Sequence, residues 1–256
     1  AVAVQEGYAY LGVGSQLFVI DVSSPSSPTV NGQTALLGDS VEDLAFAGDY
    51  AYIAAGEAGL WVIDVSEPAD PHEVGCLPTW DGDYTYNKTS SVAVSGSYAY
   101  VGGYWHRSPD DFGGWLQIVD ISNPANPREV GRRDMPWLVF AVAVTDSYAY
   151  IGTGGFLVID VSNPERMVEV WYYEQPLVID VVVTDDYYAY IATPDGLSVI
   201  DVYDPTHPWV RGDYHTWSEV YGVAISGDYA FVATASDDMR IVDVSDPSHL
   251  RFLSCF

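Results

Sequence analysis

Short runs of alternating apolar and polar residues recur along the chain, separated by turns rich in Gly, Asp, Ser and Pro. In one such stretch the pattern predicts four strands, at residues 41–47, 50–55, 60–65 and 72–76. Alternation with a period of two is typical of strands with one buried face, and Pro between the third and fourth runs interrupts a sheet. No stretch keeps a helical period over a useful length. The pattern therefore predicts an all-β protein.

The four-strand pattern occurs six times, and each copy carries two signatures. An aromatic-Ala-aromatic triplet begins at Tyr8, Tyr50, Tyr98, Tyr148, Tyr188 and Tyr229. An apolar run then ends on Asp21, Asp64, Asp120, Asp160, Asp201 or Asp243, with Pro four residues later. A unit of about 40–50 residues with four short strands is typical of one propeller blade. The sequence thus predicts an all-β, six-bladed β-propeller with four antiparallel strands per blade.

The repeat also sets the expected domain organisation. We interpret residues 1–256 as a single propeller domain, with blades at approximately 1–40, 41–88, 89–138, 139–177, 178–218 and 219–256. The strand phase at both ends of the chain indicates that each blade is built from contiguous sequence, without exchange of a strand between the termini.

The apolar runs resemble the LVIVD repeat. Close copies begin at Leu17, Leu60, Leu116 and Leu197 (LFVIDV, LWVIDV, LQIVDI and LSVIDV), and looser ones at Phe156 and Met239 (FLVIDV and MRIVDV). The resemblance covers essentially the whole chain. It implies a propeller of the cell-surface or secreted kind, because that family is mostly known from bacterial and archaeal surfaces. It implies no particular activity, since fold alone does not determine function.

Charge and hydropathy narrow the range of partners. The chain carries 36 acidic and 9 basic residues, a formal net charge of −27, so nucleic acid and anionic membrane surfaces are poor partners. No apolar run reaches the roughly 20 residues that span a bilayer, so we expect no membrane insertion. The sequence lacks an initiator Met and a signal-peptide pattern, and we expect a mature or trimmed product. Cys76 and Cys255 are expected to be free thiols.

The repeated Tyr and Asp residues are expected to be structural. The two rings of each triplet face the same side of a strand and should pack between blades. Each repeated Asp precedes a turn, where its carboxylate can accept backbone N–H groups. The alternative for the Asp residues is a ring of metal ligands or catalytic acids.

Function is expected where the chain departs from the repeat. In a propeller, the loops from second to third strand and from fourth to next first strand share one face, which we call the aromatic face. The candidate ligand-binding residues there are Trp80, Tyr84, Tyr86, Tyr104, Trp105, His106, Arg107, Trp171, Tyr214, His215 and Trp217. Aromatic and Arg residues gathered on one surface are typical of a contact site. Arg132, Arg133 and Arg211 are also expected on this face.

Two longer segments focus this expectation on the third blade. Residues 77–90 and 104–114 are interpreted as insertions that lie next to each other on the aromatic face. The opposite face, with turns of Gly, Asp, Ser and Pro, is expected to be plain. The alternative for some of the aromatic residues, Trp171 among them, is that they cap the interfaces between blades.

Two places are candidate metal sites. The oxygen-rich segment with Asp81, Asp83 and Asn87 could hold Ca²⁺, although ordinary turn chemistry is the alternative. Asp43 and Asp180 fall at one level of the inner strands, with Glu42 and Glu219 nearby. They could share a cation in the central tunnel.

These observations predict a noncatalytic extracellular or cell-surface interaction module. Its ligand would be a protein or a glycan, or a second copy of the chain, held on the aromatic face near the third blade. The alternative is a metal-dependent hydrolase or lyase with an axial pocket, which His106 and His215 could reach, although no pair of histidines has metal-ligand spacing.

Overall fold

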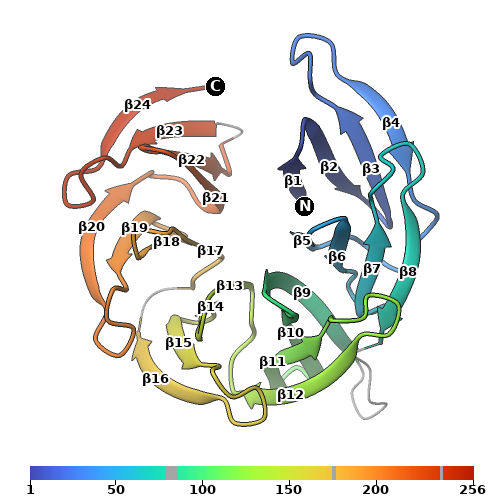
Figure 1. The fold of residues 1–256 in the computed structure, drawn as a ribbon. Coiled ribbons are helices and arrows are strands. Elements are labelled where there is room, and N and C mark those ends of the chain that lie inside the picture. The colour runs from blue at the N-terminus through green and yellow to red at the C-terminus, as the bar shows by residue number, and fades with distance from the viewer. Residues whose placement is uncertain (79–85, 175–176, 237–238) are drawn as a thin grey trace. The chain divides into compact units, whose positions relative to one another are not determined.

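The structure is a computed structural model that describes residues 1–78, 86–174, 177–236 and 239–256. It is a six-bladed β-propeller with four antiparallel strands per blade, as the repeat predicts, and the described residues contain no helix. Figure 1 shows the strands of each blade in sequence order. The chain divides into two compact units of three blades each, residues 1–139 and 140–256.

The first unit holds twelve strands. They are β1 (Val2–Gln5), β2 (Tyr8–Val13), β3 (Gln16–Asp21) and β4 (Thr29–Gln33) in the first blade; β5 (Asp43–Ala47), β6 (Tyr50–Ala54), β7 (Leu60–Asp64) and β8 (His72–Leu77) in the second; and β9 (Tyr86–Ser95), β10 (Tyr98–Ser108), β11 (Asp111–Asp120) and β12 (Arg128–Met135) in the third.

The second unit repeats the plan. Its strands are β13 (Ala141–Thr145), β14 (Tyr148–Gly152), β15 (Phe156–Asp160) and β16 (Val168–Tyr173) in the fourth blade; β17 (Asp180–Val183), β18 (Tyr188–Thr193), β19 (Gly196–Asp201) and β20 (Trp209–His215) in the fifth; and β21 (Val220–Ser226), β22 (Tyr229–Thr234), β23 (Met239–Asp243) and β24 (Arg251–Cys255) in the sixth.

Every blade is built from contiguous sequence, as expected. The order of strands in each sheet is the order along the chain, and β1 pairs with β2 of its own blade. The first strand of the third blade begins at Tyr86, three residues before the predicted blade boundary at 89. The described part of the chain contains no helix long and apolar enough to cross a membrane.

The aromatic triplets are structural, as predicted. The third ring of the triplet is buried in five blades, at Tyr10, Tyr52, Tyr100, Tyr150 and Tyr190. Neighbouring sheets within each unit share apolar clusters that contain four of these rings, those of Tyr10, Tyr52, Tyr150 and Tyr190. Burial disfavours the charged phenolate and raises the pKa of Tyr190 to about 12. These side chains therefore hold blades together and are not available to a ligand.

The repeated Asp residues organise turns, as predicted. In all six blades a carboxylate oxygen accepts the backbone N–H two residues later, for example Asp64 from Ser66 at 2.9 Å and Asp201 from Tyr203 at 3.0 Å. The hydrogen bonds from Ser66 stabilise the carboxylate and lower the pKa of Asp64. We call the end of each blade that carries these turns the Asp-turn face.

Glycines on the outer strands let neighbouring blades approach closely, a feature that was not predicted from the sequence. A Cβ at Gly75 would collide with the backbone carbonyl oxygen of Pro124 in the next blade, and one at Gly212 would lie 2.5 Å from that of Pro247. Each outer strand also carries a β-bulge beside this position, as between Val62 and Ile63 of the facing strand. The Pro-containing Asp turn of one blade is thus seated against the outer strand of the blade before it.

Candidate functional site

The segment at 104–114, expected as a loop, is instead a strand hairpin. Strand β10 continues to Ser108 and β11 begins at Asp111, so only two residues form the turn. Strand β9 pairs along this extension, with Tyr86 opposite His106. The interpretation as a loop was wrong. The extra residues lengthen β10 and β11, and their backbone groups pair with each other and with β9.

One side of this hairpin carries an aromatic cluster. The ring centroids of Tyr86 and Tyr104 lie 6.1 Å apart, and the His106 ring lies 6.0 Å from that of Tyr86 and 5.8 Å from that of Tyr104. Phe112 lies 6.1 Å from His106 and is 44 % exposed. The structure therefore brings together three of the residues predicted for the third blade, and Phe112 extends the cluster.

Trp105 and Arg107 lie on the other side of the hairpin. The Trp105 ring packs against the core shared by the second and third blades, and a Cβ at Gly113 would lie 2.8 Å from it. The Arg107 guanidinium lies over this indole, 5.2 Å from the ring centroid. Trp105 thus acts mainly in packing, which differs from its predicted role as a ligand platform.

Asn87, a predicted Ca²⁺ ligand, is buried. Its side-chain oxygen accepts the indole N–H of Trp115 at 2.9 Å, so this oxygen serves the interior of the blade. The other residues of the same predicted segment, Trp80, Asp81, Asp83 and Tyr84, lie outside the described residues.

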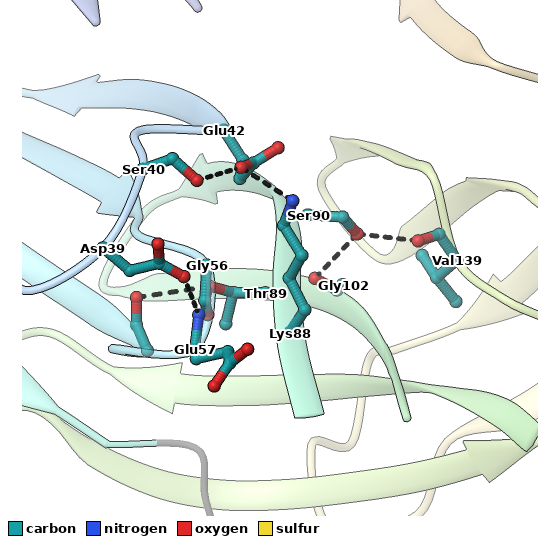
Figure 2. A network of polar contacts seen from close by, with 11 residues as sticks. Asp39, Ser40, Glu42, Gly56, Glu57, Lys88, Thr89, Ser90, Gly102 and Val139 are labelled. Atoms are coloured by element: carbon teal, nitrogen blue, oxygen red, sulfur yellow. Dashed lines mark hydrogen bonds and ion pairs between the residues drawn. The ribbon is translucent and has the colours of Figure 1, made fainter. Parts of the chain in front are cut away.

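A polar network joins the start of β9 to the second blade (Figure 2). Lys88, the single Lys of the chain, forms an ion pair of 2.7 Å with Glu42. The Thr89 hydroxyl donates to the carbonyl oxygen of Gly56 at 2.7 Å, and the Thr89 backbone N–H donates to the same oxygen at 2.9 Å. These contacts hold the first part of β9, which pairs with the extended hairpin of β10 and β11, against the second blade.

The same network orders the neighbouring loops, as Figure 2 shows. Asp39 accepts the backbone N–H of Glu57 at 2.8 Å, and the Ser40 hydroxyl donates to Glu42. On the other side, the Ser90 hydroxyl donates to the carbonyl oxygen of Val139 at 2.7 Å. Glu42, expected near a metal, is therefore engaged by Lys88 and by a hydroxyl.

The two predicted axial carboxylates each link the inner strands of neighbouring blades. Asp43 accepts the Ser91 hydroxyl and the backbone N–H of Val92, both at 2.9 Å. In the second unit, Asp180 accepts the backbone N–H of Val223 at 2.8 Å. Burial raises the pKa of Asp180, although these hydrogen bonds oppose the shift. Each carboxylate thus holds its own blade to the next one through hydrogen bonds, a role that we call an interblade clamp. The predicted cation site stays a prediction.

Metal binding can be tested against this clamp role. We expect Asp43→Ala to lower the free energy of unfolding by about 1–3 kcal/mol, because it leaves buried donors on the third blade without their acceptor. We expect a chelator to leave the melting temperature of the unsubstituted chain unchanged. A chelator-induced drop in melting temperature that disappears in Asp43→Ala would instead show that Asp43 binds a metal. Thermal unfolding followed by circular dichroism measures both.

The structure does not gather all the predicted residues on the aromatic face. Trp171 lies within outer strand β16, stacked on Tyr173 at 5.5 Å, and packs into the core of the second unit, which matches the alternative given for it. Arg211 lies toward the Asp-turn face, where its guanidinium forms an ion pair of 2.8 Å with Asp201. Its placement on the aromatic face was wrong, because the ladder pairs this end of β20 with the Asp end of β19. Arg132 lies over the buried Trp115 ring.

Among the residues that the structure describes, the most exposed aromatic residue of the aromatic face is Trp217, in the loop between β20 and β21. Its side chain is 95 % exposed, and its backbone is left-handed at φ 58°. A bulky residue in that region is strained, and such strain often marks a functional position. Thr216, which is buried, anchors the loop: its hydroxyl donates to the Ser218 carbonyl and its N–H to that of Asp195. The fold therefore holds the Trp217 indole out into solvent.

Trp217 lies at an open hollow of about 640 Å³. The lining residues are Pro194, Asp195, His215, Trp217, Ser218 and Glu219. Asp195 comes from the β18–β19 loop and Glu219 from the β20–β21 loop, so two carboxylates, an imidazole and an indole line one hollow. A second hollow, which shares Asp195 and His215, continues to Tyr214 and Asp213.

Part of this hollow was predicted from the sequence. Tyr214, His215 and Trp217 were predicted and line the two hollows, while Pro194 and Asp195 were missed. Their signal was a Pro-Asp pair in a second-to-third-strand loop, a position that the predicted geometry places on the aromatic face. Among the described residues, those of this hollow included, no three His, Cys, Asp or Glu side chains are grouped so that they could hold a metal ion. The hydrolase or lyase alternative stays a prediction.

Comparison with known proteins supports the repeat and the fold. The model of the LVIVD repeat matches residues 1–35, 38–79, 87–134, 139–175, 178–216 and 219–255. No curated protein matches the sequence. Similar solved structures include a functionally unknown protein from Desulfotomaculum acetoxidans, with 12% identity and a TM-score of 0.76 over 94% of this chain and 76% of that one.

Two further structures share the fold. The β-propeller domain of Cps50 (Swd1) from Myceliophteria thermophila has 13% identity and a TM-score of 0.75, over 100% of this chain and 85% of that one. The computationally designed Ika8 protein has 13% identity and a TM-score of 0.69, over 100% of this chain and 73% of that one. At these identities the likeness concerns the fold alone.

Proposed function

Because this chain belongs to the LVIVD-repeat family, which fixes a propeller fold but no activity, we propose its function from the aromatic face. It is a noncatalytic binding module whose ligand is a basic segment of a protein partner. The observation that carries this proposal is Trp217, held almost fully exposed on a strained backbone beside Asp195 and Glu219. In this reading the module acts outside the cell or at its surface, in keeping with its acidity.

The chemistry of the hollow suits an Arg or Lys side chain. A cation over the face of an indole is attracted by the ring quadrupole, and Trp is the best aromatic partner for this contact. The carboxylates of Asp195 and Glu219 line the same hollow and offer acceptors for the N–H groups of the cation. The hollow is open, so a segment of chain can lie across it.

The charge of the whole chain favours the same partner. With a net charge of −27, the protein attracts basic partners at long range and repels a second copy of itself. In the third blade, the cluster of Tyr86, Tyr104, His106 and Phe112 offers a second aromatic surface of the kind enriched in protein interfaces. We assign Trp217 the role of anchor.

Peptide titration tests this proposal. Synthetic peptides in which Arg or Lys alternates with neutral residues are titrated into the chain, alongside acidic peptides of matched length. We expect the basic peptides to bind, with affinity that falls as salt rises, because exposed charges are screened beyond about 10 Å at 0.1 M. We expect Trp217→Ala to weaken binding at least about thirtyfold, the loss typical of an interface hot spot.

The matched control is Trp209→Ala, which removes an exposed Trp from the Asp-turn face and keeps the same net charge. General attraction to an acidic protein affects both variants equally, so only a specific site separates them. Equal affinity of the two variants for basic peptides would contradict the proposal. Binding of neutral oligosaccharides at Trp217, with no binding of basic peptides, would show a glycan site instead.

A further inference from the structure

The fifth blade departs from the repeat at three positions on its Asp-turn face. The residue two after the repeated Asp is Ser in the other five blades, at Ser23, Ser66, Ser122, Ser162 and Ser245, but it is Tyr203 here. The residue paired with that Asp is Trp209, where the other blades carry Thr, His, Arg or Val. The turn before β18 has four residues, 184–187, instead of two, and it ends on Tyr187.

Two of these departures, Tyr203 and Trp209, line one hollow, and the third, Tyr187, packs against Tyr203. Tyr203 is 77 % exposed and Trp209 is 50 % exposed. The rings of Tyr187 and Tyr203 meet edge to face, 5.6 Å apart at 87°. Tyr187 is 46 % exposed and has a left-handed backbone at φ 65°, a strained conformation for a bulky residue. The Asp turn of this blade does not depend on these rings, because its hydrogen bond runs from the backbone N–H of Tyr203 to Asp201.

The hollow has a volume of about 410 Å³, within the range of about 300–1,000 Å³ typical of sites for small molecules. Its polar lining is preorganised. Arg211 donates to Asp201 at 2.8 and 3.2 Å and lies 3.7 Å from the centroid of the Trp209 ring. Asp204 accepts the Thr206 hydroxyl at 2.6 Å, and the ring of His207 lies against it at 3.2 Å.

We propose that this hollow, formed by Tyr203, Trp209, Asp186, Asp204, His207 and Arg211, is a binding site for a neutral saccharide. The C–H faces of a sugar ring are apolar and slightly positive, so they pack on the negative faces of Tyr and Trp rings. Sugar hydroxyl groups need both donors and acceptors. The carboxylates of Asp186 and Asp204 accept, and the guanidinium of Arg211 donates.

Charge separates this site from the hollow at Trp217. The Trp217 hollow is lined by two carboxylates and no Arg or Lys, which suits a basic ligand. Here the Arg211 guanidinium already lies over one face of the Trp209 ring and pairs with Asp201, so the cation–π contact on that face is made from within the chain. Asp186 and Asp204 line the hollow beside this donor, and the hydroxyl groups of a neutral ligand can use the acceptors and the donor together. The inference is thus independent of the function proposed for the aromatic face.

Calorimetric titration of the full chain tests the site. The probes are short neutral oligosaccharides built from glucose, mannose, galactose or xylose, at millimolar concentration. We expect at least one series to bind. We expect Tyr203→Ser to weaken that binding at least about tenfold. Ser is the residue of the other five blades at this position, so this variant keeps the turn and its fold. Trp209→Ala is expected to weaken binding to a similar extent.

Trp217→Ala is the matched control and should bind the same oligosaccharide as well as the unsubstituted chain. The proposal is overturned if no oligosaccharide series binds at millimolar concentration. It is equally overturned if the oligosaccharide that binds is unaffected by both Tyr203→Ser and Trp209→Ala, or if basic peptides rather than sugars lose affinity in these two variants.

Discussion

Replacing Trp115 by alanine is expected to lower the free energy of unfolding by about 3–5 kcal/mol, the largest effect of any substitution considered for this chain. Trp115 is fully buried between the second and third blades, packed over Gly103, and its indole N–H donates to Asn87. The substitution opens a cavity in an apolar cluster and removes a buried hydrogen bond. Urea denaturation followed by circular dichroism measures the change.

Phe112→Ala is the matched control, because Phe112 is an aromatic residue of the same strand whose ring is partly exposed. Its substitution should change the free energy of unfolding by no more than about 0.5 kcal/mol. A loss below about 1 kcal/mol for Trp115→Ala would contradict the packing described here.

Replacing Gly75 by alanine is expected to lower the free energy of unfolding by about 1–3 kcal/mol, although it adds only one methyl group. The new Cβ would collide with the carbonyl oxygen of Pro124 and would lie 3.1 Å from the carbonyl carbon of Ala125. Both are backbone atoms of the next blade's Asp turn, so relief requires the two blades to separate. For a protein of this size each kcal/mol lowers the melting temperature by about 2–4 °C, which thermal unfolding detects.

The control for this substitution is Ser254→Ala. Ser254 occupies the equivalent position in the sixth blade, where the outer strand already carries a side chain. Its substitution should change the free energy of unfolding by no more than about 0.5 kcal/mol. If Gly75→Ala were as mild as Ser254→Ala, the close approach of outer strand and Asp turn would not contribute to blade packing.

The regular part of this fold could be predicted from sequence because each signature has a local cause. Alternation of apolar residues sets the strands, the buried third ring of each triplet sets the packing face, and the repeated Asp organises its own turn through a hydrogen bond two residues away. The four strands expected between residues 41 and 76 occur within two residues of their predicted bounds. The spacing of these residues is therefore enough to predict the propeller architecture.

The sequence-based predictions failed where contacts between residues far apart in the chain determine the structure. Residues 104–114 were interpreted as a loop, but they form paired strands, in which Gly113 and Gly114 provide the space for Trp105 and for the backbone near Trp137. Asn87 suggested a metal ligand, yet its oxygen accepts from an indole 28 residues away. The strand register, which the sequence does not reveal, also placed Arg211 at the Asp-turn face.

The expectation that the Asp-turn face is plain was wrong for the fifth blade. A consensus across the six blades describes that face well, but Tyr187, Tyr203 and Trp209 deviate from it in one blade only. The signal was present in the sequence as Tyr in place of Ser after Asp201. It becomes interpretable once the structure shows that Tyr203 and Trp209 line a single hollow and that Tyr187 packs against Tyr203.

Mapping of the bound peptide by two-dimensional NMR tests the central claim most directly. With a saturating basic peptide, the proposed site predicts that the amide shifts of the non-proline residues in 193–196 and 215–220 change, while those in the Asp turn at 201–208 do not. A peptide that binds but shifts only amides outside the two loops around Trp217, or that shifts none in the second unit, would contradict the assignment of Trp217 as the anchor of a protein-binding site.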